Sequence, residues 1–375
     1  MNFLLKIAVQ ILRLMYLPFK CLPVKCKVSF ISRQADSPSL DFQMLDREIQ
    51  KQHPDYETVF LCKTLGGGLP EKLRYCFHML RQMYHLATSQ IVILDSYCIA
   101  ASVLHHKKSL LIIQIWHSIG TMKKFGYSIL DMPEGSSSRL AHIMNMHANY
   151  DYILAASDAY KSHLAEGFGY PLSQIVTLPL PRVEALESPA YREDAHRRIY
   201  ARYPKLREKK TIVYVPTFRK GENESFRQAA AALADAVDYT RYNLVIKAHP
   251  LAQLQLSHKD AIVDKEFSSF DMLFISDYVI SDFSCIIYEA AILKKPLYFY
   301  TYDYEHYLST RDIYMDYKKE MPGPICDSAP DVIQKISQNA CDLKQVEAFL
   351  NKYVTPKSSR ETKDIADFIF EHRKS

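Results

Sequence analysis

Three apolar stretches in the second half of the chain each end in side chains that bind anions or exchange protons. The stretches cover residues 211–215, 244–247 and 278–280, and the side chains are Thr217 with Arg219, Lys247 with His249, and Asp282 with Ser284. If the stretches are strands of one parallel sheet, these groups meet at its carboxyl edge, where open α/β sheets bind ligands. Cationic, hydroxyl and imidazole groups gathered there indicate an anion-binding cleft.

The last of these stretches begins a longer pattern over residues 278–300. It reads as a strand, a polar turn, a helix with one apolar face and a second strand, with Pro296 ending the helix. Asp282 and Ser284 stand where a helix N-cap would stand. The amino end of such a helix binds anions through its unpaired N–H groups. An ordinary α/β crossover fits the same residues equally well, because the unit lacks a glycine signature.

A further candidate group follows the apolar stretch 110–116. His117 comes directly after it, with Ser118 next and Lys123 and Lys124 shortly beyond. A histidine at a strand end, followed by a hydroxyl group and two cations, suits an anionic substrate. The alternative is a histidine that forms only local hydrogen bonds, with the lysines on a solvated face.

Strands alternate with helices throughout the chain, which predicts a parallel, doubly wound sheet in each half. A cluster of Pro179, Pro181 and Pro189 indicates a linker between the halves. The expected division is an amphipathic segment over 1–26, a first domain over 27–188, a second domain over 189–357 and a closing helix over 358–375.

Composition limits the classes of function. The chain of 375 residues is 48% hydrophobic and 24% charged, with a formal net charge of +5, which is too small to argue for nucleic acid binding. The eight cysteines are scattered without a Cys-x-x-Cys pair, so we expect reduced thiols in a cytosolic compartment and no zinc site. No acidic pair indicates another metal, and no cofactor is expected.

The first 19 residues are mostly apolar and predict an amphipathic helix, because Lys6 and Arg13 lie on its polar stripe. The cations that follow before any acid are Lys20, Lys25, Lys27 and Arg33. One interpretation is an interfacial helix on the anionic inner leaflet of a membrane. A second is a helix that packs on the protein's own core. A third, a signal peptide, disagrees with the charge pattern.

Several short motifs occur in a specific order over nearly the whole chain. They are Trp116-His117 with Lys123-Lys124, Pro216-Thr217-Phe218-Arg219, His249-Pro250, Ser281-Asp282-Phe283-Ser284, Lys295-Pro296, Tyr300-Thr301-Tyr302-Asp303, Arg311-Asp312 and Pro322-Gly323-Pro324. With them the chain resembles the CDP-glycerol:poly(glycerophosphate) glycerophosphotransferases, the enzymes of teichoic-acid and related capsule assembly. Four residues depart from the family's usual Gly, Arg, Trp and Tyr and leave the donor and acceptor open, namely Ser118, Lys247, Phe218 and Phe283.

The resemblance implies a GT-B architecture, in which two Rossmann-like domains face a cleft. It implies transfer of a polyol phosphate, glycerol or ribitol phosphate, from a CDP-polyol to a hydroxyl of a lipid-linked acceptor at the cytoplasmic face of the membrane. The family's two functional histidines correspond to His117, expected as the base, and His249. The expected donor-binding residues are Thr217, Arg219, Lys247, Asp282, Ser284 and Glu289. Arg219 and Lys247, together with His249, are expected to bind the pyrophosphate, and Glu289 is expected to reach the ribose. The expected residues on the acceptor or phosphate side are Ser118, Lys123, Lys124 and Arg311.

Two other functions fit the same sequence. A GT-B glycosyltransferase using a nucleotide sugar would have the same fold and the same strand-end residues. An inactive membrane-bound scaffold of an envelope-polymer complex would bind CDP without turnover, although the presence of both histidines argues against it.

Overall fold

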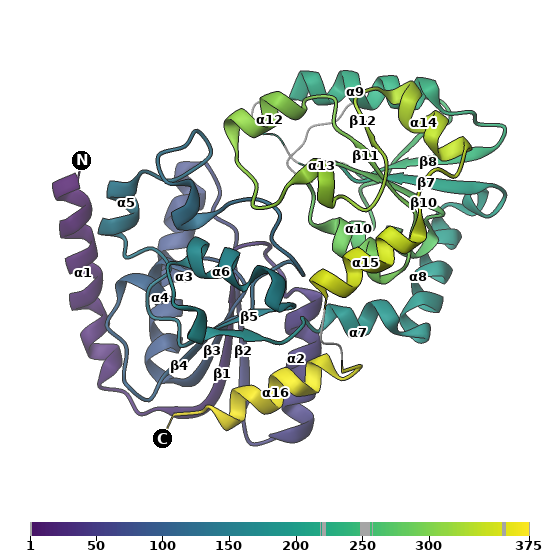
Figure 1. Ribbon diagram of the computed structural model, residues 1–375. Coiled ribbons are helices and arrows are strands. Elements are labelled where there is room, and N and C mark those ends of the chain that lie inside the picture. Colours follow the sequence, from purple (N-terminus) through teal and green to yellow (C-terminus); the bar gives the residue numbers. More distant parts are fainter. Residues whose placement is uncertain are drawn as a thin grey trace. The chain divides into compact units, whose positions relative to one another are not determined.

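Alternating strands and helices build one parallel β-sheet in each of two units (Figure 1). This computed structural model describes residues 2–217, 219, 223–247, 256, 258–354 and 358–374. The first unit comprises Met1–Ile119, Lys124–Glu184 and Pro356–Ser375, and the second comprises Gly120–Lys123 and Ala185–Thr355. The expected α/β architecture with two doubly wound sheets is confirmed.

The first unit carries a sheet whose described strands run in the order β2-β1-β3-β4-β5-β6, and all neighbouring pairs are parallel. The strands are β1 (Lys25–Ser32), β2 (Glu57–Cys62), β3 (Ser89–Leu94), β4 (Leu111–Gln114), β5 (Tyr152–Ala155) and β6 (Ile175–Thr177). The helices are α1 (Asn2–Lys20), α2 (Leu40–Gln52), α3 (Leu69–Thr88), α4 (Ile99–Val103), α5 (Ser138–Ile143), α6 (Lys161–Phe168) and α16 (Glu361–Glu371), while α7 (Arg182–Glu187) spans the boundary between the units.

Buried central strands explain why the first sheet forms. Ile91 and Ile93 of β3 and Leu111 and Ile113 of β4 are fully buried, and each strand contains a continuous apolar run, residues 91–94 and 111–113. Such runs are typical of parallel strands that helices cover on both faces. The α/β alternation therefore follows directly from the residue pattern.

The second unit carries a parallel sheet whose described strands run in the order β12-β11-β10-β7-β8-β9. Its strands are β7 (Lys210–Tyr214), β8 (Tyr242–Ile246), β9 (Ile262–Val263), β10 (Tyr278–Ser281), β11 (Leu297–Tyr300) and β12 (Ile325–Cys326). Its helices are α8 (Pro189–Arg202), α9 (Asn223–Ala236), α10 (Ser269–Ile275), α11 (Ile286–Ile292), α12 (Tyr304–Thr310), α13 (Tyr317–Glu320), α14 (Ala329–Ser337) and α15 (Leu343–Tyr353).

The strand order of the second sheet identifies where a ligand would bind. Read from β9, the order is that of the dinucleotide-binding Rossmann fold, and the direction of the chain's progress reverses between β7 and β10. Open α/β sheets bind ligands at this switch point, beyond the carboxyl ends of the strands. The segments that follow β7 and β10 begin with Val215 and Asp282, so the motif residues lie at the switch point.

The two units exchange short segments of chain, which the expected domain boundaries did not include. Gly120–Lys123 groups with the second unit, where the Tyr314 N–H donates to the Met122 carbonyl at 2.9 Å and Lys123 forms an antiparallel bridge with Ile313. In the other direction α16, the expected closing helix, packs beside α2 in the first unit (Figure 1). Ile365 and Ile369 of α16 are fully buried there.

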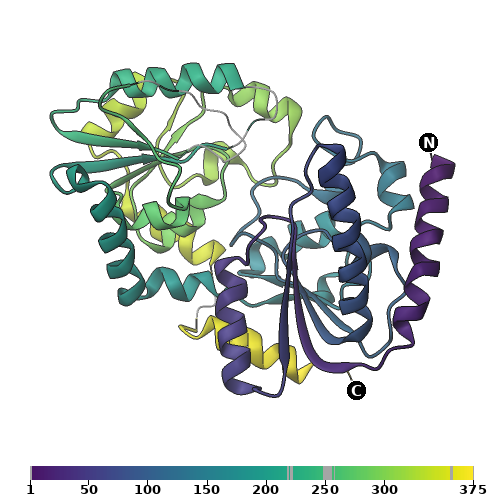
Figure 2. The same cartoon turned by 180° about the vertical axis from the view of Figure 1, so that it is seen from behind.

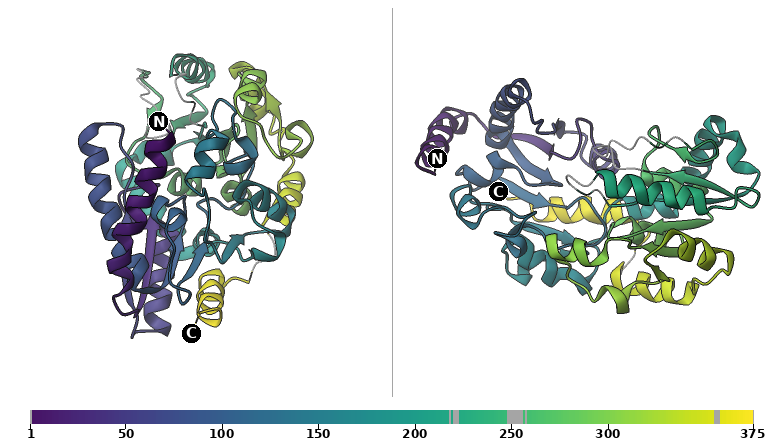
Figure 3. Two further views of the ribbon diagram at one scale, coloured as in Figure 1. Left: turned by 90° about the vertical axis from the view of Figure 1, so that its left-hand side faces the viewer. Right: turned by 90° about the horizontal axis from the view of Figure 1, so that it is seen from above.

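The N-terminal helix α1 packs on the first unit, which was one of the roles considered for it. It runs beside α3 (Figures 2 and 3), and Val9 and Tyr16 are buried, with the Tyr16 hydroxyl 3.0 Å from His106 Nδ1. Its other apolar side chains remain exposed, including Phe3 at 75% and Leu14 at 64%. The helix therefore packs on its own unit and still presents an apolar surface. No helix within the described residues has the length and apolar character needed to cross a bilayer.

Candidate active site

His117 follows β4 at the carboxyl edge of the first sheet, as the sequence predicts. The residue before it, Trp116, has a left-handed backbone with φ +65°, and the two rings lie 4.1 Å apart between centroids. His117 Nδ1 is 3.0 Å from the carbonyl oxygen of Asp95, the residue that follows β3. Because a carbonyl oxygen only accepts, Nδ1 carries the hydrogen and Nε2 carries the lone pair of the neutral ring. That tautomer is the one a general base needs at Nε2.

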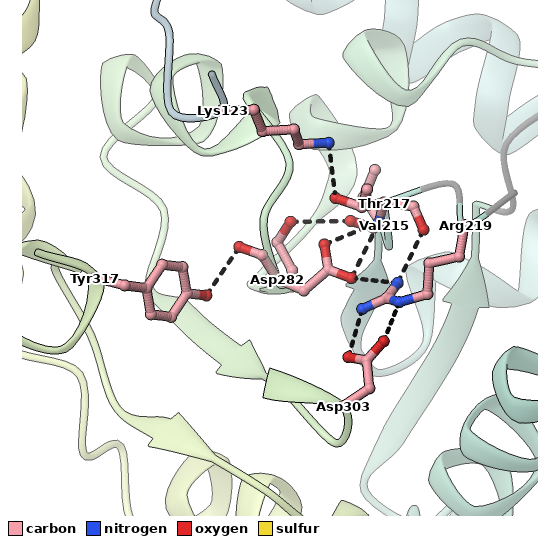
Figure 4. A network of polar contacts seen from close by, with 8 residues as sticks. Lys123, Val215, Thr217, Arg219, Asp282, Asp303 and Tyr317 are labelled. Carbon is pink, nitrogen blue, oxygen red and sulfur yellow. Dashed lines mark hydrogen bonds and ion pairs between the residues drawn. The ribbon is translucent and has the colours of Figure 1, made fainter. Parts of the chain in front are cut away.

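A buried ion-pair network joins three strand ends of the second sheet (Figure 4). Arg219 donates from Nη1 to Asp282 Oδ2 at 2.9 Å and from Nη2 to Asp303 Oδ1 at 2.8 Å, and its Nε also donates to Asp303. A fourth hydrogen bond, 2.9 Å long, runs from Nη1 to the Thr217 carbonyl. These partners follow β7, β10 and β11, so one guanidinium fixes the ends of all three strands.

The network changes the roles expected for its members. Arg219 is 4% exposed, and its guanidinium donors are bonded to the carboxylates of Asp282 and Asp303. The expected contact of Arg219 with the pyrophosphate is therefore not supported by this arrangement. Asp282 is fully buried and accepts from the Thr217 N–H at 2.8 Å, so it does not cap α11. Its backbone carbonyl accepts from the Tyr317 hydroxyl at 2.9 Å. Arg219 and Asp282 act on the site by positioning Thr217.

Lys247 is likewise held by buried acceptors. Its ammonium donates to Asp264 Oδ2 at 2.6 Å, to the Asp264 carbonyl at 3.2 Å and to the Phe267 carbonyl. The ammonium has three N–H groups, so these three acceptors match its full donor capacity. Burial opposes ionisation of Asp264, but hydrogen bonds from Lys247 and Tyr203 outweigh it and lower the pKa of that carboxyl. Lys247, like Arg219, was expected on the pyrophosphate and instead stabilises a loop.

The helix after β10 is shorter than the sequence predicts. It is α11, seven residues long, with Cys285 at the N-cap position and no side-chain cap. Ser284 is half-buried, and its Oγ accepts from the Ile286 N–H at a long 3.4 Å. Glu289, expected at the ribose, is 3% exposed within this helix. Ser284 thus follows β10 at the switch point, but it is not the N-cap that the sequence predicted for this helix.

Lys123 is the cation that the structure brings to this switch point. Its ammonium lies 3.4 Å from Thr217 Oγ1 (Figure 4). The same ammonium lies 5.9 Å from the centroid of the Tyr307 ring. Burial, reinforced by the nearby positive charge of Arg311, lowers the pKa of Lys123 to about 8. Among the described residues, the hydrogen bond of this buried ammonium is the long one to Thr217, so the ammonium is well suited to receive an anion. Lys123 therefore belongs to the second unit, although the sequence assigned it to the first domain.

The comparisons with known proteins decide the family. The model of the CDP-Glycerol:Poly(glycerophosphate) glycerophosphotransferase family matches residues 14–371. The chain belongs to this family. It is 33% identical over 352 residues to the teichoic acid ribitol-phosphate primase of Bacillus spizizenii strain W23, with coverage of 92% of this chain and 90% of the relative. It is 28% identical to the teichoic acid poly(ribitol-phosphate) polymerase of the same strain, covering 98% of this chain and 60% of that protein.

The fold of this glycerophosphotransferase-family chain also has solved counterparts. The wall teichoic acid polymerase TagF aligns with a TM-score of 0.75 at 19% identity, over 97% of this chain and 94% of the solved chain. The GT-B architecture expected from the motifs is thereby supported, with each of the two Rossmann-like units formed around its own parallel sheet.

The remaining expected site residues fall in different parts of the family fold. Ser118 and Lys124 are half-buried and belong to the first unit. Arg311 is also half-buried but belongs to the second unit. His249, and Phe218 among the departures from the family pattern, lie outside the described residues. Phe283, another departure, stacks on Tyr307 at 3.9 Å between centroids. Position 283 therefore makes an aromatic contact without the hydroxyl of the family's usual tyrosine.

Sequence reasoning missed two carboxylates that organise the second unit. Asp303 follows β11 just as Asp282 follows β10, so the strand-end pattern that located Asp282 also contained it. Asp264 follows the two-residue strand β9, which is too short for a recognisable apolar run. Among the described residues, no group of three or more His, Cys, Asp or Glu side chains is arranged to hold a metal ion.

Proposed function

We propose that this chain transfers a polyol phosphate from a CDP-polyol to a hydroxyl group of a lipid-linked acceptor in teichoic-acid biosynthesis. Membership in the glycerophosphotransferase family supports the reaction class. The observation that carries the mechanism is the bond from His117 Nδ1 to the Asp95 carbonyl, because it leaves Nε2 to accept a proton. Histidine titrates near neutral pH and is the side chain most often used as a general base.

The reaction balances with groups that the chain supplies. The acceptor oxygen attacks the β-phosphorus of the CDP-polyol, and its proton goes to His117 Nε2. A new P–O bond forms to the acceptor, while the anhydride P–O bond breaks and CMP leaves with the electron pair. Phosphoryl transfer needs little covalent help and depends on positioning and charge stabilisation. The proposed phosphate site consists of Lys123, the neighbouring Thr217, and Ser284, which follows β10.

Ribitol phosphate is the first donor to test, because the two relatives described above are named for ribitol phosphate. The experiment measures CMP release by the purified protein with CDP-ribitol, CDP-glycerol and UDP-sugars, each with a lipid-linked acceptor analogue. The proposal expects CMP release from a CDP-polyol. Turnover of a UDP-sugar alone would support the glycosyltransferase alternative, and CDP binding without any turnover would support the inactive scaffold.

The lowered pKa of Lys123 predicts how donor affinity depends on pH. The ammonium is charged below about pH 8 and neutral above it, and only the charged form attracts phosphate. Donor affinity should therefore decrease as the pH rises through about 8. The Lys123→Met variant should lose about 1.5–3 kcal/mol of binding at neutral pH, the range for a hydrogen bond to a charged group. Calorimetric titration of a CDP-polyol below and above pH 8 measures both effects.

Two controls make this measurement specific to Lys123. Lys123→Arg keeps a positive charge that does not titrate in this range, so its affinity should not fall as the pH rises through 8. Lys319→Met removes an exposed lysine of the same unit, paired with Asp316, and should leave affinity unchanged. If the wild type and Lys123→Met lost affinity over the same pH interval, Lys123 would not bind the donor phosphate.

The proposal also includes peripheral attachment to an anionic membrane surface. Eight apolar side chains on the neighbouring helices α1 and α3 are 39% to 75% exposed, and we refer to them together as the α1–α3 patch: Phe3, Leu4, Ile7, Ile11, Leu14, Leu69, Leu73 and Phe77. Exposed cations on the same two helices are Lys6, Lys72, Arg74 and Arg81. Apolar side chains with flanking cations are characteristic of interfacial helices on anionic lipid.

The structure changes which cations are assigned to this surface. Lys27, expected to face the lipid, is 1% exposed and donates to Thr88 Oγ1 at 2.6 Å. Arg13 donates from Nε to the Val103 carbonyl at 2.9 Å. Removing residues 1–20 would also uncover the surface on which Val9 and Tyr16 pack. Point variants of exposed residues are therefore a cleaner test than truncation.

We expect the double variant Ile7→Ser with Phe77→Ser to bind anionic vesicles at least tenfold more weakly, since each buried apolar side chain contributes about 1.5–3 kcal/mol. Its melting temperature should stay close to that of the wild type, because both side chains are exposed. Vesicle sedimentation measures the effect. The control Leu172→Ser changes a side chain that is 56% exposed elsewhere in the first unit. Equal sedimentation of the double variant and the wild type would contradict membrane binding through the α1–α3 patch.

A further inference from the structure

Hydrogen bonds link the chain segment around His117 to the segment that follows β3, and together the two segments and these bonds form a closed ring in the first unit. Gln114, the last residue of β4, accepts at Oε1 from the Trp116 N–H at 2.9 Å and donates from Nε2 to the Ser96 carbonyl at 3.3 Å. Trp116 directly precedes His117, and Ser96 directly follows Asp95. The ring closes where His117 Nδ1 donates to the Asp95 carbonyl. The Gln114 amide thus connects Trp116, which precedes His117, to Ser96, which follows Asp95. The Asp95 carbonyl is the group that orients the His117 imidazole.

The hydrogen-bond partners Trp116 and Ser96 allow the Gln114 amide only one orientation. An N–H group must meet an oxygen and a carbonyl must meet an N–H, so Oε1 faces Trp116 and Nε2 faces Ser96. Gln114 is fully buried, so losing either partner would leave a desolvated polar group. The amide therefore ties the ends of β3 and β4 together at a defined separation.

The backbone at Trp116 explains why such a tie is needed. A bulky residue at φ +65° is strained by about 1–3 kcal/mol, and it keeps this conformation only where its surroundings enforce it. The Trp116 ring packs against Phe125 and Phe168 at centroid distances of 4.5 and 5.2 Å. These contacts hold the ring, while Gln114 holds the N–H group. Together they turn the chain so that the next residue points back towards β3.

We propose that Gln114 is a positioning residue that fixes the tautomer and orientation of His117. This inference rests on the proposed function, in which His117 is the base. Gln114 touches neither substrate nor reacting atom. It acts by keeping Trp116 in its left-handed conformation, which keeps His117 Nδ1 on the Asp95 carbonyl and leaves the lone pair on Nε2.

The test uses Gln114→Met, which keeps the volume of the side chain and removes its hydrogen bonds to Trp116 and Ser96, together with one to Tyr150. We expect kcat to fall about 10²-fold, the loss that follows from misplacing a reacting group by about 1 Å, while KM for the donor stays unchanged. Nitrogen NMR of the histidine rings, with the His117 signal assigned from His117→Ala, should show that Nδ1 is no longer the sole protonated nitrogen. The control Gln82→Met removes another fully buried glutamine of the first unit and should change neither readout.

A second variant, Gln114→Glu, tests the same inference if Gln114→Met does not fold. Gln114→Glu keeps an oxygen that accepts from Trp116 and, when protonated, a hydroxyl that donates to Ser96, so it should retain the wild-type tautomer below the pKa of that carboxyl. A wild-type tautomer and normal kcat in Gln114→Met would overturn the inference, as would an altered tautomer in protonated Gln114→Glu. If the wild-type protein turned over no CDP-polyol, the proposed function would fail, but the ring signal would still report whether Gln114 positions His117.

Discussion

Replacing His117 by alanine should lower turnover by about 10²–10⁴-fold, the contribution expected of a general base. The Nδ1 bond to the Asp95 carbonyl fixes the tautomer whose Nε2 accepts the proton. Donor affinity should change little, because the proposed phosphate ligands Lys123, Thr217 and Ser284 are in the second unit. Single-turnover CMP release, together with calorimetric titration of the donor, separates the two quantities.

The matched control is His53→Ala. His53 is also half-buried in the first unit, but its ring stacks on Phe370 at 3.6 Å, away from the strand ends. Its replacement should leave turnover per folded molecule unchanged. Near-normal turnover in His117→Ala would remove His117 from the mechanism, and a parallel loss of donor affinity would assign it to binding instead of proton transfer.

Replacing Arg219 by leucine should destabilise the second unit by about 3–5 kcal/mol, the cost of leaving a buried charge without its partner. The variant would leave two carboxylates without their cationic partner: that of Asp282, which is fully buried, and that of Asp303, whose side chain is 10% exposed. It would also release the Thr217 carbonyl and with it the loop after β7. Denaturant titration, followed by a probe in the second unit, measures the change in unfolding free energy.

Arg227→Leu is the matched control for this measurement. Arg227 pairs with Glu224 on the exposed surface of α9, where an ion pair contributes about 0–1 kcal/mol. The two substitutions remove the same chemical group, so the difference between them isolates burial. If Arg219→Leu kept full stability and lost only donor affinity, the guanidinium would bind the pyrophosphate, as the sequence alone suggested.

The fold was predictable from the sequence because parallel strands buried on both faces leave continuous apolar runs. The second strand expected after Pro296 in the 278–300 pattern agrees with β11. The return of α16 to the first unit was not predictable, because an amphipathic helix near the end of a chain carries no information on which sheet it covers.

The candidate site was predictable in its location more than in its roles. Strand ends correctly indicated His117, Thr217, Asp282 and Ser284 at the sheet edges. Residue type could not distinguish a cation that binds ligand from one already neutralised. Lys247 and Arg219 are held by Asp264, Asp282 and Asp303, and these carboxylates lie far away in the sequence. Lys123 is the opposite case, because contacts with Ile313 and Thr217, which are distant in the sequence, place it in the second unit.

The most direct test of the central claim is mass analysis of the acceptor after a single turnover with CDP-ribitol and, separately, CDP-glycerol. The account predicts that a lipid-linked acceptor analogue gains the mass of one polyol phosphate for each CMP released, and that His117→Ala greatly slows this gain. Release of CMP with an unmodified acceptor, or a mass gain that corresponds to a sugar, would contradict polyol-phosphate transfer by this chain.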